Sequence, residues 1–381
     1  MSTYPPRRCG VASFTHALAA AAGGREIAAL LTPERGTPYP LEVHHRIRQD
    51  EPADYVNTAR DLGRCVDVVA VQHEPTIWGG EDGEAVLDFL GALELPAVST
   101  LHTVRSNPTE RQRVILREVV QRSAATVVMS RSAAELLSTS YGLPKTRIEV
   151  IPHGVPDLPV LPTDTIKGGL GVDGHEVILA FGLVGPAKGL ELVLDALPAV
   201  IKARPTVLLA IVGPTHPDLV RDQGETYRDG LVARAQTLGI SGHVRFVDKF
   251  IGRVEMTRWL QAADVVVTAY PDLDQTVSGT LSSAMGAGRV VVSTPYPYAA
   301  ELLADGRGVL VEAGSASKLA AALAEVLADD EMRAAIGRRA HKQARAMTWT
   351  QVGDRYRRLF DGVAAARPAA AVRTRPVPLK A

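Results

Sequence analysis

Histidine side chains follow two apolar segments of this chain, at His73-Glu74 and at His102. In an open parallel sheet, ligands bind beyond the carboxyl ends of the strands, where such residues lie. A histidine there can hydrogen-bond a substrate hydroxyl or exchange a proton with it. A single histidine could equally well cap a loop, but two of them on one rim favour a functional site.

A second candidate feature is the turn Cys9-Gly10-Val11, which opens a predicted helix through residues 14–20. The first N–H groups of a helix have no partner within the helix, and the helix dipole is positive there. This arrangement suits a phosphate at Gly10. A turn glycine without any ligand explains the same pattern equally well.

A lysine lies in the glycine-containing loop 181–189, which includes Gly185 and Lys188 and precedes the amphipathic segment 190–197. A cation at the start of a helix is opposed by the helix dipole. A bound diphosphate would compensate this repulsion. The alternative is an ordinary solvated lysine.

Small and polar residues follow the strand predicted at 265–270: Gln275, Thr276, Val277, Ser278, Gly279, Thr280 and Leu281. Their size lets backbone N–H groups approach an anion or a sugar hydroxyl. Glu301, after the strand predicted at 290–294, could accept hydrogen bonds from a ribose or a sugar, or could be a carboxylate at a helix start.

The elements that position these residues alternate between short β-branched runs and longer amphipathic stretches, which predicts parallel sheets of βαβ units. Strands are expected at 26–31, 66–73, 96–102, 126–130 and 148–152, then at 177–182, 207–213, 244–247, 265–270, 290–294 and 309–311. The length of 381 residues also favours two domains. Helices are expected at 316–327, 331–347 and 349–360.

The predicted domains are 1–157 and 171–347, joined by a linker at 158–170 that overlaps the three-proline stretch 156–163. Residues 348–362 are expected as a helix that returns to the first domain, and 363–381 as a disordered tail.

Only residues 1–4 precede Pro5-Pro6, so the first strand is expected to be short, either by nature or because the start is misassigned.

Overall charge gives no indication of nucleic-acid binding, since Lys plus Arg and Asp plus Glu both number 42. Cys9 and Cys65 form no metal-ligand motif, and no apolar run is long enough to span a membrane. We therefore expect a cytoplasmic protein without a disulfide framework or a zinc site. Arginines at 111, 113, 117 and 122 share a helical stretch with apolar residues, which favours a basic solvent face over membrane-surface association.

Six ordered segments together resemble the signatures of the family-4 (group 1) glycosyltransferases of the GT-B type: residues 5–11, 72–80, 100–102, 151–155, 182–189 and 279–288. The resemblance spans nearly the whole chain. It implies two Rossmann-like, doubly wound parallel-sheet domains with a cleft between them. The implied activity is transfer of a hexose from a nucleotide diphosphate sugar to an acceptor hydroxyl, with retention at the anomeric carbon. The resemblance implies that this transfer requires no metal and no cofactor, since the nucleotide sugar is the donor substrate. UDP-glucose and GDP-mannose both fit as donors, and a sugar, a lipid-linked sugar or a small metabolite fits as acceptor.

The resemblance also implies roles for individual residues. Gly10, Gly185 and Lys188 would hold the donor diphosphate, and His102 would contact the sugar at its reacting face. The amides of Gly279, Thr280 and Leu281 would bind phosphate or sugar, and Glu301 would help to hold the nucleotide. Candidates on the acceptor side are His73, Glu74 and Arg105.

Two departures from the family pattern stand out. Leu183 occupies the place of an arginine that the family uses as a second phosphate clamp, and Thr276 and Ser283 occupy the places of its two glutamates. Gln275, Asp274 or Ser278 could then supply hydrogen bonds to the sugar, because an amide or a hydroxyl can replace a carboxylate as acceptor. These departures predict an unusual subfamily.

Two rival functions are considered. A non-catalytic nucleotide-sugar-binding protein would keep the fold and Lys188 and would tolerate the loss of the acidic pair. An NAD-dependent oxidoreductase is disfavoured, because no predicted strand is followed by G-x-G-x-x-G with an acidic residue about 20 positions later.

Overall fold

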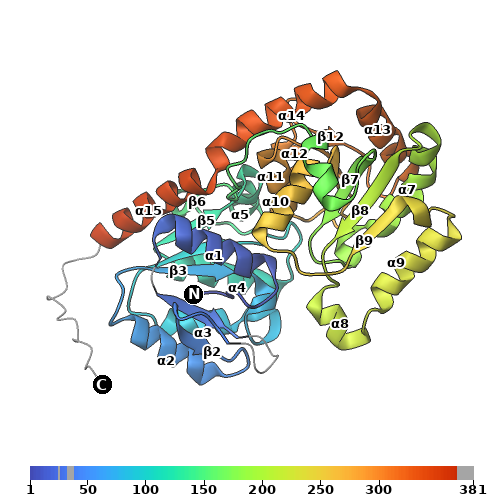
Figure 1. Ribbon diagram of the computed structural model, residues 1–381. Helices are drawn as coiled ribbons and strands as arrows, with labels where there is room; N and C mark the ends of the chain where they lie inside the picture. Colours follow the sequence, from blue (N-terminus) through green and yellow to red (C-terminus); the bar gives the residue numbers. More distant parts are fainter. Residues whose placement is uncertain (25, 32–37, 367–381) are drawn as a thin grey trace. The chain divides into compact units, whose positions relative to one another are not determined.

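The computed structural model describes residues 1–24, 26–31 and 38–366, and the chain forms two compact units (Figure 1). One unit consists of Met1–Pro152 and the segment from Thr350 onward, and the other of His153–Trp349. Each contains parallel strands alternating with helices, which confirms the predicted α/β class with two Rossmann-like sheets. The predicted disordered tail 367–381 lies outside the described residues, but α15 continues to Ala365, so 363–365 are helical.

The first unit contains strands β1 (Ile27–Leu30), β2 (Val43–Ile47), β3 (Val69–His73), β4 (Ala97–Leu101), β5 (Ala125–Val128) and β6 (Ile148–Val150). Its helices are α1 (Gly10–Ala22), α2 (Pro52–Leu62), α3 (Ala85–Ala92), α4 (Glu110–Arg122), α5 (Arg131–Thr139) and α15 (Trp349–Ala365). β3, β4, β5 and β6 pair in this order, and β1 pairs with β2, all in parallel. The sequence analysis did not include β2, whose interior His44-His45-Arg46 lacks an apolar run.

The first residues of the chain join these two sheets. The N–H of Ser2 donates to the carbonyl of Ala28, and the N–H of Gln72 donates to the carbonyl of Met1, both at 3.0 Å. Residues 1–3 therefore lie between β1 and β3 as an extended segment, in which Ser2 forms an isolated bridge to Ala29. The sequence predicted a short first strand here, and the structure has this single bridge in its place.

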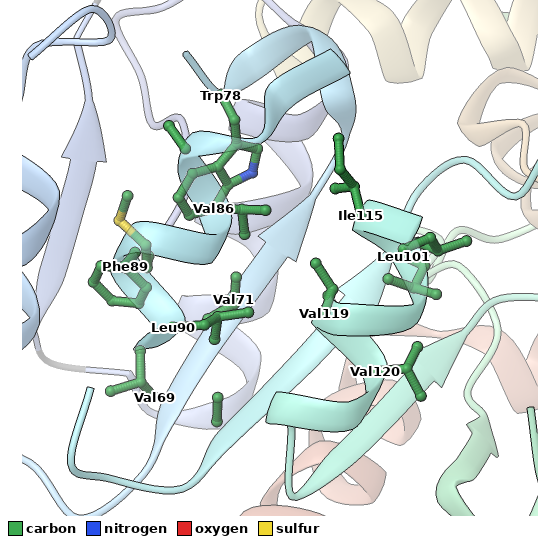
Figure 2. Packing of buried hydrophobic residues seen from close by; sticks show 14 of the residues in the cluster. Val69, Val71, Trp78, Val86, Phe89, Leu90, Leu101, Ile115, Val119 and Val120 are labelled. Atoms are coloured by element: carbon green, nitrogen blue, oxygen red, sulfur yellow. The ribbon is translucent and has the colours of Figure 1, made fainter. Parts of the chain in front are cut away.

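The core of the first unit packs α3 and α4 against β3 and β4 (Figure 2). Val71 on β3 and Phe89 on α3 are both fully buried, as is Val119 on α4. The indole of Trp78 stacks near Tyr55 and donates from Nε1 to the carbonyl of Gln72 at 3.1 Å. This packing fixes the end of β3, from which His73 and Glu74 emerge.

Helix α15 packs onto the first unit through a stripe of buried residues that includes Val352, Gly353 and Tyr356. The hydroxyls of Tyr356 and Thr100 on β4 lie 2.9 Å apart, and both are buried. A Cβ atom at Gly353 would come within 2.5 Å of the carbonyl oxygen of Ala21, so this helix approaches α1 closely.

The second unit contains strands β7 (Glu176–Phe181), β8 (Val207–Val212), β9 (Val244–Val247), β10 (Val265–Thr268), β11 (Val290–Ser293) and β12 (Val309–Leu310). Its helices are α6 (Asp164–Lys167), α7 (Leu190–Ala203), α8 (Pro217–Gln223), α9 (Thr226–Thr237), α10 (Arg253–Ala262), α11 (Gly279–Gly286), α12 (Pro297–Leu302), α13 (Ala316–Ala328) and α14 (Asp330–Ala344). The strand order is β12-β11-β10-β7-β8-β9, all parallel. The order reverses between β7 and β10, and ligands of such sheets bind at that switch point.

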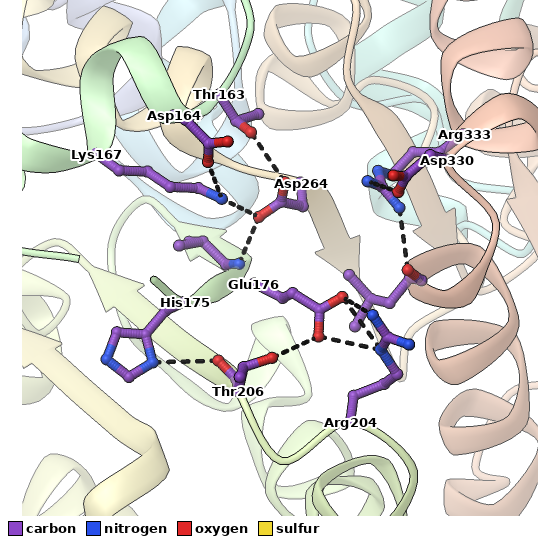
Figure 3. A network of polar contacts seen from close by, with 12 residues as sticks. Thr163, Asp164, Lys167, His175, Glu176, Arg204, Thr206, Asp264, Asp330 and Arg333 are labelled. Carbon is purple, nitrogen blue, oxygen red and sulfur yellow. Dashed lines mark hydrogen bonds and ion pairs between the residues drawn. The ribbon is translucent and has the colours of Figure 1, made fainter. Parts of the chain in front are cut away.

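Part of the expected linker is a folded piece of the second unit (Figure 3). Residues 164–170 form helical turns, and Lys167 forms a buried ion pair with Asp264 at 2.9 Å. The same carboxylate accepts from the N–H of Val177 at 2.7 Å and from the Thr163 hydroxyl at 3.1 Å. Because a buried charge must be paired, Asp264 ties this segment to the first strand of the sheet. The linker expected at 158–170 is therefore irregular only up to residue 163.

Candidate active site

A cavity opens at the switch point of the second unit, where β7 and β10 end side by side. Its lining residues come from β7, β8 and β10, from the segments that follow β7 and β10, and from the starts of α7 and α11: Ala180, Phe181, Gly182, Leu183, Val184, Lys188, Leu190, Ile211, Val267, Tyr270 and Thr280. Lys188 is the one charged residue among them. An anionic group is therefore the ligand that this cavity suits.

Lys188 ends the helical turn Pro186–Lys188, and α7 begins two residues later, after Gly189 in the left-handed conformation. Its ammonium group donates to the hydroxyl of Tyr270 at 3.2 Å and lies 4.6 Å from the centre of the Tyr270 ring. Burial by itself raises the pKa of the Tyr270 hydroxyl. The positive charge of Lys188 and hydrogen bonds from Ser278, Thr280 and Lys188 outweigh burial, so that this pKa is lowered overall.

Gly182 directly follows β7 and has a φ of 115°, a conformation that favours glycine. A Cβ atom at Gly182 would lie 3.9 Å from both the Lys188 Nζ and the Thr280 Oγ1. The ammonium group and the hydroxyl therefore face the same backbone position. Gly182 gives a ligand close access to both groups.

The start of α11 is capped by Ser278, whose hydroxyl accepts from the N–H of Leu281 at 3.2 Å. This changes the expected role of Leu281, because its amide is used by the cap and its side chain is fully buried. The N–H groups of Gly279 and Thr280 are the first two of the helix and need no partner within it. A Cβ atom at Gly279 would come within 2.9 Å of His153 Nε2, so only glycine fits there.

The other predicted donor residues do not line this cavity. Gly185 is buried, and its carbonyl accepts from the N–H of Lys188 at 2.9 Å, which closes the turn. Gln275 is half-buried, and its carbonyl accepts from the N–H of Tyr298 at 3.4 Å. Glu301 lies in the last turn of α12, so it is not a carboxylate at a helix start.

The two departures from the family pattern are also located. Leu183 lines the cavity, where an arginine would have added a second cation. Thr276 is buried, and Ser283 is half-buried within α11. No carboxylate is among the residues that line this cavity.

In the first unit, Gly10 is the first residue of α1, and the Cys9 sulfur caps the helix by accepting from the N–H of Ala12 at 3.3 Å. A Cβ atom at Gly10 would meet no atom of residues 1–24, 26–31 or 38–366 within 4 Å. The open space lies at the N-terminal end of the helix, where an anion is stabilised.

His102 follows β4 and is largely buried, at 7% exposure. Its Nε2 lies 2.9 Å from the Oε1 of Gln72 on β3, and because that oxygen accepts, Nε2 carries the proton. The edge of the imidazole also packs against the ring of Phe14 on α1, with centroids 4.8 Å apart. Three elements therefore fix the orientation of this histidine.

A second cavity of the first unit brings the acceptor-side candidates close together. It is lined by His73, Pro75, Asp82, Thr103, Arg105, Gln112, Ile115, Leu116 and Tyr141. Beside it, the Glu74 carboxylate accepts from the Thr103 hydroxyl at 2.6 Å, and burial raises the pKa of this carboxyl group. Arg105 is exposed.

His73 is 2% exposed, and within the described part of the chain neither of its ring nitrogens has a hydrogen-bond partner. Burial lowers the pKa of His73 to about 4. Its imidazole is therefore neutral near pH 7 and can donate through one nitrogen and accept through the other. An unpaired buried polar group is costly, so a ligand hydroxyl would fit this cavity.

Acid should destabilise the protein through His73. Its ordinary pKa of 6.5 is that of the unfolded chain, so the unfolded state binds the extra proton first as the pH falls. The free energy of unfolding should decrease between about pH 6.5 and pH 4, by up to about 3 kcal/mol from this residue. Chemical denaturation of wild type and His73→Asn across this range measures the effect. An equal loss in both proteins would contradict it.

Sequence reasoning missed Tyr270 and His153 as site residues. Tyr270 ends the strand predicted at 265–270. Its place after an apolar run could have indicated a site residue at the end of that strand. His153 packs against Gly279, and burial lowers its pKa to about 4. The sequence gives no signal for that contact.

Three of the four arginines on α4 form ion pairs: Arg111 with Glu84, Arg113 with Glu110 and Arg122 with Glu118. These ion pairs partly neutralise the positive charge of α4. That charge was the reason for considering membrane-surface association. Among the described residues, no helix is both long and apolar enough to cross a membrane. In the same residues, no cluster of three or more His, Cys, Asp or Glu side chains is arranged to hold a metal ion.

Comparison with protein families gives two matches that follow the two units. Residues 9–157 match the model described as Glycosyltransferase Family 4, and residues 163–343 match Glycosyl transferases group 1. The chain belongs to the family-4 (group 1) glycosyltransferases. The resemblance stated from the sequence segments is thereby confirmed.

Two curated relatives of this glycosyltransferase have names that concern inositol compounds. The D-inositol 3-phosphate glycosyltransferase of Segniliparus rotundus is 28% identical over 317 residues, covering 78% of this chain and 68% of the relative. The phosphatidyl-myo-inositol mannosyltransferase of Mycolicibacterium smegmatis is 28% identical over 281 residues, covering 73% and 68%.

Solved structures support the GT-B fold of the glycosyltransferase. Sucrose-phosphate synthase from Thermosynechococcus elongatus superposes with a TM-score of 0.72 and 18% identity over 93% of each chain. Anabaena HepE in complex with UDP superposes with a TM-score of 0.67 and 18% identity, covering 81% of this chain and 82% of that one. At these identities the likeness concerns the fold alone.

Proposed function

We propose that this glycosyltransferase transfers a hexose from a nucleotide diphosphate sugar to an acceptor hydroxyl, with retention at the anomeric carbon and without a metal ion. The observation that carries the proposal is the Lys188 ammonium group, fixed beside Gly182 at the switch point of the second sheet. A leaving diphosphate needs a preorganised positive charge at that place. UDP-glucose and GDP-mannose are the two donors proposed.

In the proposed reaction, the bond between the anomeric carbon and the diphosphate oxygen breaks while the acceptor oxygen bonds to the same face of that carbon. The acceptor proton passes to the leaving phosphate oxygen. Lys188 and the first amides of α11 stabilise the charge that develops on the phosphate. Gly10 offers its amide to the diphosphate, and His102 contacts the transferred hexose.

The acceptor is proposed to bind the cavity beside His73. Its neutral imidazole and the Glu74 carboxylate can each hydrogen-bond a hydroxyl. Thr103 lines the cavity and donates a hydrogen bond to the Glu74 carboxylate. Arg105 at the rim would meet the outer part of the acceptor.

The test is a transfer assay with each donor and a panel of sugars and polyols, in buffer with EDTA. Anomeric coupling constants of the product, measured by NMR, report retention or inversion. The alternative is a non-catalytic nucleotide-sugar-binding protein, which the lack of carboxylates around the Lys188 cavity favours. Donor binding with neither transfer nor hydrolysis would support that alternative. An inverted product or an absolute need for metal would contradict the proposal.

Gln275→Ala should weaken productive use of the nucleotide sugar while affinity for the free nucleoside diphosphate stays nearly unchanged. The reason is that a sugar hydroxyl left without its partner costs about 1–3 kcal/mol, or about 5-fold to 150-fold in kcat/KM. Ser278→Ala should show the same contrast with an added loss of stability of about 1 kcal/mol, because Ser278 caps α11. Calorimetric titration with UDP and GDP beside donor kinetics gives both quantities.

The matched control is Gln236→Ala, which removes an exposed glutamine from α9. Equal loss of affinity for the sugar donor and the free diphosphate would place Gln275 on the nucleotide. No change in either measurement would move sugar recognition to other residues.

A further inference from the structure

We propose that Tyr270 is a positioning residue that holds the Lys188 ammonium group in place for the leaving phosphate. This inference rests on the proposed function and adds a residue to it. The lysine reaches the tyrosine across 82 positions of sequence, because β7 and β10 are neighbours in the sheet. Neither residue, taken alone in the sequence, indicates that the two are in contact.

Tyr270 meets the lysine in two ways at once. Its hydroxyl accepts a hydrogen bond from Nζ at 3.2 Å, and its ring lies 4.6 Å from the same nitrogen. A cation over an aromatic face is attracted by the ring quadrupole. The two contacts together restrict the position of the ammonium group: one to the hydroxyl, the other to the face of the ring.

The tyrosine is itself rigidly held. It is 5% exposed, and its ring stacks on Tyr296 with centroids 5.2 Å apart and planes 18° apart. Its carbonyl accepts from the Thr294 hydroxyl at 2.8 Å. Its own hydroxyl lies 3.4 Å from that of Ser278, the residue that caps α11. Tyr270 thus connects Lys188 to the helix start that faces the same cavity.

Lys188 needs such support for two physical reasons. A lysine side chain has four flexible carbons, and ordering it costs up to about 2 kcal/mol of conformational entropy. It also precedes the N-terminus of α7, where the helix dipole opposes a positive charge. Since Leu183 adds no second cation to this cavity, the placement of the single ammonium group matters more. Tyr270 offsets these costs before any ligand arrives.

A purely structural role for Tyr270 predicts different results from a positioning role. Loss of a buried hydroxyl would lower stability whatever stands at position 188. A positioning role acts only through Lys188, so its effect on turnover should vanish when the lysine is absent. A double-mutant cycle separates the two roles.

The experiment compares wild type, Tyr270→Phe, Lys188→Ala and the double variant by donor kinetics. Tyr270→Phe keeps the ring and removes the hydroxyl, and it should lower kcat about 10-fold with a much smaller change in KM. In the Lys188→Ala background the same change should alter kcat by less than about twofold. An equal loss of kcat in both backgrounds would overturn the proposal.

Tyr298→Phe is the matched control. Tyr298 is fully buried, and its hydroxyl pairs with that of Ser282 at 2.7 Å. This variant should lose stability to a similar extent as Tyr270→Phe and keep wild-type kcat. A comparable fall in kcat in both tyrosine variants would show that the effect comes from lost packing, against the proposal.

A second readout does not depend on sugar transfer. The absorbance of tyrosinate, measured against pH, should contain an early ionisation that disappears in Tyr270→Phe and moves to higher pH in Lys188→Ala. If wild type transfers no hexose but shows this shift, the proposed function fails while the Tyr270–Lys188 contact stands. An unchanged titration in Lys188→Ala would overturn the contact itself.

Discussion

Lys188→Ala should lower hexose transfer about 100-fold to 1000-fold while the protein stays folded, because deleting one preorganised charge contact costs about 2.7–4 kcal/mol of barrier. Lys188 is the one charged residue that lines the cavity where β7 and β10 end. Its charge becomes most important as negative charge gathers on the departing phosphate. The loss should therefore fall on kcat more than on donor affinity.

The measurement is steady-state kinetics of the purified variant, with circular dichroism and thermal unfolding to verify the fold. Lys202→Ala is the matched control, since Lys202 is exposed in the last turn of α7 and carries the same charge. Lysine removal there should leave transfer unchanged. Transfer by Lys188→Ala within about threefold of wild type would refute the assigned role, since deleting such a contact should cost far more.

His102→Ala should reduce turnover about 100-fold and weaken donor binding much less, as expected for a contact that strengthens in the transition state. The Oε1 of Gln72 accepts from His102 Nε2, and Phe14 packs against the ring, so the imidazole is already oriented in the free protein. A preoriented group contributes to the transition state without further ordering cost.

Single-turnover kinetics and donor titration of the same preparation separate the two quantities. Gln72→Leu is a useful companion, because it removes the partner of His102 and keeps the histidine. It should lower turnover in the same direction but less severely, since Phe14 still restrains the ring. An unchanged turnover number in His102→Ala, with weaker donor binding alone, would assign this histidine to ground-state binding.

The sequence predicted most strands because central parallel strands are buried on both faces and read as apolar runs. Val207–Val212 and Val265–Thr268 are of this kind, and every residue in them is buried. Strand β2 was missed because its interior is polar and only its two ends are buried. At residues 1–3 the sequence indicated only a shortened strand, because the extended segment there is held by hydrogen bonds to β1 and β3 and by one isolated bridge.

Local sequence also indicated where chemistry could occur. His102, Lys188 and the turn before Gly279 each follow a strand, and the rule that ligands bind at strand ends needs no tertiary information. What the sequence could not decide is which of these residues meet. Gly185, Gln275 and Glu301 have similar local settings, yet none of them lines the Lys188 cavity.

The tertiary structure decided the partnerships, because they depend on strand order rather than on neighbours in sequence. Because β10 lies beside β7, Tyr270 contacts Lys188. Because β4 lies beside β3, Gln72 contacts His102. The family, the fold and the candidate cation thus followed from motifs and periodicity. The groups that orient each candidate emerged only when the sheets were assembled, since hydrogen bonds and burial are properties of that assembly. The same holds for His73 at the end of β3, whose ring nitrogens have no hydrogen-bond partner among the residues that the structure describes.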